Sequence, residues 1–392
     1  MEGASQEGGE AAVLVDEGFE QKLMERYLKS CLSILPRPYE SQDSVRTTIL
    51  YFVTSSLDVL GFLDSPAAEA RGLMPPDLRA TVIEWLYAMH IPRPTHEAED
   101  EEHAAPRWGF RGSPFLGLPW HVCGQDEHQH AAAAAAESDG RHEMDCAHLA
   151  TTYTALCTLR VLGDDFSRLD RAAILSAIKH LQQPDGSFSA NVGGSESDVR
   201  FIYCAAAICY MLQEWSFDVP KAVRYILSSQ TYEYAMAQGP GQEAHGGSTY
   251  CSIATLVLTG FLDHLPHQDK LTRWLLERQV TGFQGRVNKD ADTCYSFWIG
   301  ASLKMLDKLH LADYRLSKAF TMSCQTPIGG FGKCVENPPD VLHTYMALCG
   351  LSMMGAPGLR DIHCALGMTQ RAAGGFAYPL RTARDALGLT LD

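Results

Sequence analysis

The chain has no CxxC pair, no secretion signal and no long hydrophobic run. Its 12 cysteines are scattered over 392 residues, and residues 1–15 are acidic and glycine-rich, without the charged-then-apolar layout of a signal peptide. A disulfide framework is not expected in so long a chain without such a signal. We therefore expect reduced thiols and a cytoplasmic protein.

Basic residues are also scarce. The chain carries 32 Lys+Arg against 47 Asp+Glu, a formal net charge of −15, which argues against a general nucleic-acid or anionic-membrane binder. The longest uncharged stretch, 341–359, contains His343, Ser352 and Pro357, so it is interpreted as a buried helix and not a membrane span. We expect no nucleic-acid partner and no stable membrane insertion, while a local basic pocket for a small anion stays possible.

An internal repeat is the most informative feature. Tyrosines recur every 45 to 50 residues, each early in a segment of small and apolar residues: Tyr153, Tyr203, Tyr250, Tyr295 and Tyr345. A glutamine follows each tyrosine after 25 to 30 residues: Gln183, Gln230, Gln279, Gln325 and Gln370. Glycine-rich loops follow most of these glutamines, so each unit has room for two helices and a loop.

The two helices of a unit differ in their apolar pattern. The tyrosine segment is apolar on nearly all sides, as a buried helix must be, whereas the next segment has one apolar face, formed in the first unit by Leu169, Ala172, Leu175, Ile178 and Leu181. Segments 44–63 and 75–91 look like one more hairpin, giving about six, and stacked hairpins form either an open solenoid or a closed ring. The sequence thus predicts an all-α repeat fold with one continuous core.

Residues 121–145 interrupt the repeat with four histidines, Cys123 and six consecutive alanines. An extra metal site is one interpretation of this stretch. We favour a surface insertion between units.

Polar residues cluster just before the tyrosines. Asp292 and Cys294 precede Tyr295, and His343 precedes Tyr345; if the inner helices are parallel, these side chains gather at one end. One carboxylate, one thiolate and one imidazole with an open fourth position are typical of catalytic zinc. The alternative is a capping Asp, a core Cys and a hydrogen-bonded core His.

A second set of residues is cationic. Arg286 and Lys289 lie in a loop just before the proposed metal ligands. Together with His245 and the Tyr295 phenol they suit a diphosphate, whose leaving-group charge such donors stabilise. The alternative is a solvated basic loop. Arg200, at the start of an otherwise apolar helix, is also better explained by a bound anion than by packing.

Several stretches resemble a known family: FRGSPFLGLPW, GSESDVRFIYCAAAICYML, AHGGSTYCSIATL, GRVNKDADTCYSFWIGASLKML and PDVLHTYMALCGLSMM. They look like the β subunits of type I protein geranylgeranyltransferases, in the protein prenyltransferase β-subunit family, over roughly residues 20–370. The resemblance implies an α/α barrel of six helical hairpins at 16–376, between a disordered acidic segment at 1–15 and a tail at 377–392. It also implies a heterodimer with an α subunit.

The resemblance further implies an activity. The family transfers a geranylgeranyl (C20) group from its diphosphate to the cysteine of a C-terminal CaaX box, usually ending in Leu, on proteins such as Rho/Rac-type small GTPases. It implies a zinc site formed by Asp292, Cys294 and His343, with Tyr295 and Lys289 completing the catalytic set. Magnesium is not expected to be required, because Lys333 matches the lysine that takes its place.

The remaining matches describe binding sites. The diphosphate site would comprise His245, Gly246, Gly247, Arg286, Lys289, Tyr295 and Arg200. The prenyl pocket would be lined by Thr48, Tyr51, Phe52, Tyr203 and Trp298, and Thr48 stands where the farnesyl enzyme carries a Trp that shortens the pocket. Contacts to the CaaX peptide would come from His148, Ala150, Phe201 and Leu342.

Other functions stay open at this point. The β subunits of farnesyltransferase and Rab-type geranylgeranyltransferase share the zinc motif, although Thr48 and Lys333 argue against the farnesyl enzyme. A terpene cyclase is suggested by the QxxDGSF motif at 182–188, but the chain has no DxDD proton donor. A non-catalytic helical scaffold would need neither a metal nor a cationic loop.

Overall fold

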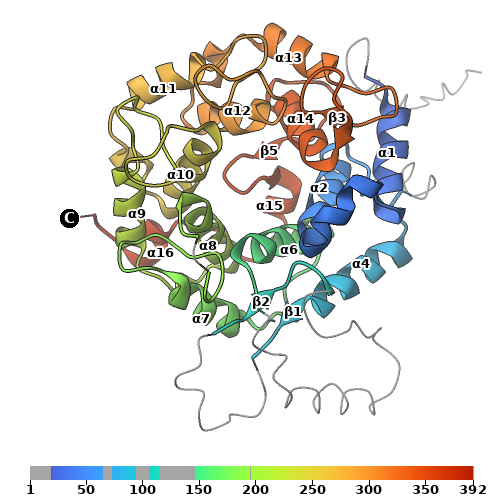
Figure 1. Cartoon of the computed structure of the whole chain (residues 1–392). Helices are drawn as coiled ribbons and strands as arrows, with labels where there is room; N and C mark the ends of the chain where they lie inside the picture. Colours follow the sequence, from blue (N-terminus) through green and yellow to red (C-terminus); the bar gives the residue numbers. More distant parts are fainter. Residues whose placement is uncertain (1–18, 65–72, 94–105, 115–145, 195, 392) are drawn as a thin grey trace, which may run out of the picture.

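The computed structural model describes residues 19–64, 73–93, 106–114, 146–194 and 196–391. Within these residues, six buried helices form an inner ring: α2 (Arg46–Val59), α6 (Leu149–Val161), α8 (Val199–Leu212), α10 (Gly246–Thr259), α12 (Tyr295–Met305) and α14 (Val341–Met353). Each packs against the next, and α14 packs against α2, so the ring is closed (Figure 1). The predicted all-α barrel is confirmed, and the open solenoid is excluded.

A second set of helices surrounds this ring: α1 (Gln21–Ser33), α4 (Pro76–Ala88), α7 (Arg171–Leu181), α9 (Val219–Ser228), α11 (Gln268–Leu276) and α13 (Tyr314–Ser323). Each outer helix contacts the inner helix that follows it in the chain. The pattern had not singled out α1, which is the outer partner of α2. In α7 the buried face includes Ile174 and Ile178, whereas Ala172, expected on that face, is exposed.

Short elements connect the hairpins. Three two-residue antiparallel pairs occur in the described chain: β1 (His90–Ile91) with β2 (Gly109–Phe110), β3 (Phe331–Gly332) with β4 (Pro339–Asp340), and β5 (Ile362–His363) with β6 (Met368–Thr369). The remaining elements are the 3-10 helices η1 (Arg37–Val45), η5 (Leu262–His264) and η6 (Leu309–Leu311), and the short helices α15 (Gln370–Gly374) and α16 (Ala383–Leu387).

Residues 361–374, here called the plug, lie in the middle of the ring (Figure 1). Aromatic side chains from all six inner helices surround it in a continuous series of ring contacts: Tyr51, Tyr153, Tyr203, Tyr250, Phe297 and Tyr345. The phenols of Tyr153 and Tyr250 donate to the carbonyls of Leu366 and Cys364, each at 2.8 Å. Those of Tyr51 and Tyr345 both donate to Gly367. The repeated tyrosine therefore anchors the plug.

One of the five predicted tyrosines does not belong to this series. Tyr153, Tyr203, Tyr250 and Tyr345 occupy the fifth position of their helices, whereas Tyr295 is the first residue of α12. Placing Tyr295 in register with the others was therefore wrong by two residues. Phe297 takes its place around the plug, and Tyr295 lies at the end of the barrel where the inner helices begin.

The glutamines link neighbouring units. The Gln279 side chain donates to the Asp313 carbonyl at 2.7 Å and accepts from the Asp313 N–H at 2.9 Å. Gln182 makes the same pair with Asp218, at 2.8 and 2.9 Å. The repeat landmark in this unit is the neighbouring Gln183, whose side chain donates to the Leu181 carbonyl. Each such glutamine fixes the start of the next outer helix.

The division at residue 376 stays a prediction, but the segment beyond it contacts the barrel. Tyr378 donates to the Met211 carbonyl at 2.7 Å, and Arg384 pairs with Asp263 at 2.9 Å. Residues 1–15 and the 121–145 insertion lie outside the described residues. In the part of the chain that is described, no helix combines the length and apolarity needed to cross a membrane.

Candidate active site

The inner helices begin at the same end of the barrel, because an outer helix between each two consecutive inner helices returns the chain. Five residues before the ring tyrosine, each of four helices carries an N-capping side chain that accepts a backbone N–H: His148, Asp198, His245 and Asp340. Such caps satisfy the free N–H groups of a first turn. The polar residues that precede the tyrosines therefore gather at one end, as the sequence predicted.

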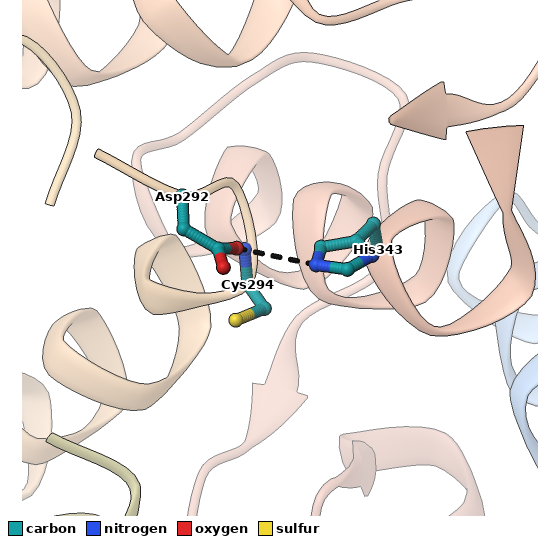
Figure 2. Close-up of side chains that lie close together, drawn as sticks. All are labelled: Asp292, Cys294 and His343. Atoms are coloured by element: carbon teal, nitrogen blue, oxygen red, sulfur yellow. Dashed lines mark hydrogen bonds and ion pairs between the residues drawn. The ribbon is translucent and has the colours of Figure 1, made fainter. Parts of the chain in front are cut away.

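The structure brings Asp292, Cys294 and His343 together at this end, with their potential ligand atoms all within 4.8 Å of one another (Figure 2). The Nε2 atom of His343 lies 3.2 Å from Oδ1 of Asp292. The Asp292 and His343 side chains are only 13% and 15% exposed, and Cys294 is buried. Among the described residues this is the one cluster of three or more such groups with this spacing.

The three side chains shift one another's pKa values. Burial alone would lower the pKa of His343, but its hydrogen bonds to the Asp292 and Asp340 carboxylates outweigh burial and raise the pKa to about 9. Burial would raise the pKa of Asp292, and hydrogen bonds from His343 and Cys294 lower it overall. Burial and the Asp292 charge raise the pKa of the Cys294 thiol. A divalent cation would reverse that last shift, because a coordinating thiol is deprotonated.

His245 and Tyr295 form a second polar pair. The Nδ1 atom of His245 accepts the N–H of Gly247 at 3.0 Å, so in the neutral ring the proton resides on Nε2. Nε2 then donates to the Tyr295 hydroxyl at 3.0 Å, leaving the phenol proton free for another acceptor. Burial, with a contribution from Arg286, lowers the pKa of His245 to about 4, which keeps the ring neutral.

Two glycines make room for the Tyr295 ring. A Cβ atom on Gly285 would lie 2.0 Å from Cζ of Tyr295, and one on Gly246 would lie 3.1 Å from its Cδ1. The Gly246 N–H donates to the Gly285 carbonyl at 2.9 Å, which ties the two segments together. Gly246, which the sequence assigned to the diphosphate site, therefore also leaves space for the Tyr295 ring. Gly285 leaves space for the same ring.

The predicted cations differ in their surroundings. Arg286 pairs with Glu243 at 3.0 Å, and Lys289 is exposed on the same loop. Lys333 lies 3.8 Å from Oδ2 of Asp292 and is 61% exposed. Arg200 pairs with Asp198 at 2.6 Å and with Glu196. Its charge is thus balanced within the chain, so its position does not require a bound anion. Its contact with a ligand stays a prediction.

An apolar cavity of about 350 Å³ opens beside these groups. Its lining includes His245, Gly247 and Arg200, and it also includes aromatic side chains and Ala150. Among these the sequence predicted Tyr51, Phe52, Ala150, Tyr203 and Trp298. Thr48 does not line the cavity directly. Its hydroxyl lies 3.2 Å from that of Thr154, which does.

The predicted peptide contacts occupy neighbouring positions. His148 caps α6 and meets the Phe201 ring edge-on, with the centroids 5.7 Å apart. Ala150 lines the cavity, and Leu342 is next to His343 in α14. Burial lowers the pKa of His148. Of these four residues, Ala150 lines the cavity, and the peptide contacts stay a prediction.

The sequence reasoning missed Asp340, Gly285 and Met346. Asp340 holds Nδ1 of His343 at 2.6 Å, and its signal was an Asp at a helix start three residues before a candidate ligand. Met346 lines the cavity, but nothing distinguishes it from core residues of an apolar helix.

Comparisons with known proteins identify the family. A sequence model of the prenyltransferase alpha-alpha toroid domain matches residues 19–368. The chain belongs to this prenyltransferase family. This prenyltransferase chain is 39% identical over 359 residues to the geranylgeranyl transferase type-1 subunit beta of Dictyostelium discoideum, covering 91% of this chain and 96% of that protein.

Two further comparisons agree. The type-1 subunit beta of Arabidopsis thaliana is 37% identical over 371 residues, covering 91% of either chain. Candida albicans protein geranylgeranyltransferase-I, solved in complex with GGPP, superposes with a TM-score of 0.76 at 22% identity, covering 93% of this prenyltransferase and 100% of that chain. The last match supports the toroid fold, and the two sequence relatives confirm the resemblance seen in the motifs.

Proposed function

We propose that the chain is the catalytic β subunit of a zinc-dependent protein geranylgeranyltransferase type I. One observation carries the proposal: the Asp292–Cys294–His343 cluster, the His245–Tyr295 pair and the apolar cavity all lie at one end of a single barrel. This arrangement suits a reaction that joins a thiol to a long apolar chain with loss of diphosphate. The two type-1 beta relatives support the choice within the family.

The residues of the cluster fit zinc. A thiol, an imidazole and a carboxylate are all common zinc ligands, and three protein ligands with an open position are typical of catalytic sites. Zinc bound there supplies a positive charge that keeps a coordinated substrate cysteine as thiolate at neutral pH, where a free thiol is mostly protonated. The partner of Nδ1 on His343 leaves Nε2 directed at the other ligands.

The side chains of the barrel account for the remaining steps. The phenol proton of Tyr295 and the cationic groups of Arg286 and Lys289 stabilise the charge that develops on the diphosphate. The cavity orients the prenyl chain and excludes water from its reactive carbon. Lys333, near Asp292, supplies positive charge to the diphosphate. The family resemblance predicts that this lysine takes the place of a magnesium ion.

The proposal includes a partner and an acceptor. We infer an α subunit, because both relatives are named as one subunit of a larger enzyme, and acceptor proteins that end in a CaaX box with a final Leu. A reduced, cytoplasmic setting is part of the proposal.

Prenyl transfer tests the proposal. The chain, co-expressed with a matching α subunit, would be offered labelled C15 and C20 diphosphates and peptides ending in Leu or Ser, with and without a zinc chelator. We expect chelator-sensitive C20 transfer to the Leu peptide. Transfer of C15 to the Ser peptide would instead favour the farnesyl enzyme. Failure of every transfer by a zinc-loaded complex would exclude CaaX prenylation.

Metal retention tests the ligands separately. Cys294→Ala and His343→Ala should each abolish zinc retention in the purified complex, measured by elemental analysis. Cys209→Ala is the matched control, since Cys209 is also buried but lies in α8. Full zinc in both site variants would remove the ligand assignment. A non-catalytic scaffold would hold no zinc even in the unmodified complex.

A further inference from the structure

We propose that Asp340 is a positioning residue of the metal site, whose carboxylate orients His343 so that Nε2 becomes the ligand atom. The inference rests on the metal site of the proposed function and extends it to a residue outside the ligand set. The observation that carries it is that both carboxylate oxygens of Asp340 are engaged by His343 itself.

The two contacts fix the histidine at both ends. Oδ1 of Asp340 accepts the backbone N–H of His343 at 2.9 Å, which caps α14, and Oδ2 lies 2.6 Å from Nδ1 of the imidazole ring. The backbone of Asp340 is also held, because it pairs with Phe331 between β4 and β3 and its carbonyl accepts from the Thr344 hydroxyl at 2.6 Å. The carboxylate is therefore a rigid reference for the ring.

The contact also selects the tautomer. A neutral imidazole has one N–H donor and one acceptor nitrogen, and a carboxylate can only accept. In the neutral ring that binds a metal, the proton of His343 therefore belongs on Nδ1. Nε2, which lies 3.2 Å from Oδ1 of Asp292, is then the nitrogen left available as a ligand. A metal-bound histidine almost always donates its other N–H in this way, and the acceptor raises the basicity of the ligand.

A second unit of the barrel repeats the arrangement. Asp198 occupies the same capping position in α8, accepts the N–H of Arg200 at 2.8 Å and binds the Arg200 side chain, with Nε 3.0 Å from Oδ2. In both units one aspartate caps the inner helix and orients a functional side chain in its first turn. In α6 and α10 the cap is a histidine that uses Nδ1 for the backbone. In two of these four units, therefore, the capping aspartate also binds a side chain of the first turn.

The test measures zinc affinity in the complete heterodimer by competition with a chromophoric chelator. Second-sphere partners typically contribute 10–100-fold to metal affinity. We expect Asp340→Ala to weaken zinc binding about 100-fold and Asp340→Asn about 10-fold, because the amide oxygen still accepts from Nδ1 but lacks the charge. Asn caps helices as well as Asp, so Asp340→Asn keeps the test valid should the alanine variant fail to fold.

Asp313→Ala supplies the matched control. Asp313 caps the outer helix α13 by accepting the N–H of Leu316 at 3.0 Å, so its loss removes a comparable cap away from the site. Zinc affinity should be unchanged in this variant. The absorption spectrum of cobalt-loaded protein gives a second readout, and it should change in both Asp340 variants and stay unchanged in Asp313→Ala.

The outcomes separate the inference from the proposed function. Zinc affinities of both Asp340 variants within twofold of the unmodified heterodimer would overturn the positioning role while leaving the metal site intact. An equal loss in Asp313→Ala would assign the effect to helix stability and would also overturn the role. An unmodified heterodimer that binds neither zinc nor cobalt would overturn both the inference and the metal site.

Discussion

The glycine at position 285 leads to the sharpest prediction, because a single methyl group there collides with a proposed catalytic phenol. A Cβ on Gly285 would lie 2.0 Å from Cζ and 2.2 Å from the hydroxyl oxygen of Tyr295. The carbonyl of Gly285 is bonded to the Gly246 N–H, which limits how far the backbone can retreat. In Gly285→Ala the Tyr295 ring must therefore move.

The size of the effect follows from the distances. Ordinary contact begins at 3.4 Å, so the ring must shift by about 1.4 Å, which separates the Tyr295 hydroxyl from His245. A 1 Å misplacement in an active site can reduce the rate about 10²-fold, or roughly 2.7 kcal/mol of transition-state stabilisation. We expect kcat/KM for the prenyl diphosphate to fall about 100-fold, more than in Tyr295→Phe, which keeps the ring in place.

Steady-state kinetics of the heterodimer with a saturating peptide measures this directly, with zinc content as a check that the metal cluster survives. Gly374→Ala is the control, because a Cβ there meets nothing within 4 Å. A Gly285→Ala enzyme whose kcat/KM stays within threefold of the unmodified enzyme would refute the steric argument and the role of Tyr295 together.

Three further changes test the fold and the pocket. Asp58→Asn should lower the free energy of unfolding by about 3 kcal/mol, because the fully buried Asp58 carboxylate pairs with Arg360 at 2.6 Å; an unchanged urea midpoint would contradict this. Thr48→Trp should shift the donor preference from C20 toward C15, measured by competition between the two diphosphates. An unchanged preference would contradict the role of Thr48 in setting pocket length. Burial lowers the pKa of His90 to about 4. As pH falls from about 6.5 toward that value, the unfolded chain binds a proton at this histidine and the folded chain does not. The free energy of unfolding therefore decreases over this range. His90→Phe, which keeps a ring against Phe110, should therefore make stability less dependent on pH between 7 and 5, and a thermal-unfolding series with an unaltered slope would disprove it.

The sequence was informative wherever local pattern determines structure. The apolar segments around Tyr153, Tyr203 and Tyr250 predicted buried helices, because helical periodicity depends only on near neighbours. The regular spacing of the three tyrosines predicted that these helices are in register. The parallel start of these helices then brought Asp292 close to His343, although 51 residues separate them in the chain.

The remaining features depend on distant contacts that local patterns do not encode. The acceptor for the Tyr51 phenol is Gly367, 316 residues later, so no periodicity reveals that the tyrosines anchor the plug. The placement of Tyr295 in the tyrosine series failed because the ring position of this unit belongs to Phe297, two residues later. The ion pair of Arg200 is different, because its partner Asp198 is only two residues earlier; this local contact was present in the sequence and was overlooked.

The plug has a consequence for biosynthesis. The phenol of Tyr51 emerges from the ribosome long before Gly367, and at roughly 5–20 residues per second the interval is about 15–60 s. During that time the tyrosines of the early repeats have no carbonyls to bond, and the first helix of the ring has no α14 to pack against. The nascent barrel is an open crescent with an exposed apolar interior, the kind of surface that chaperones recognise, and it closes only after the plug has been translated.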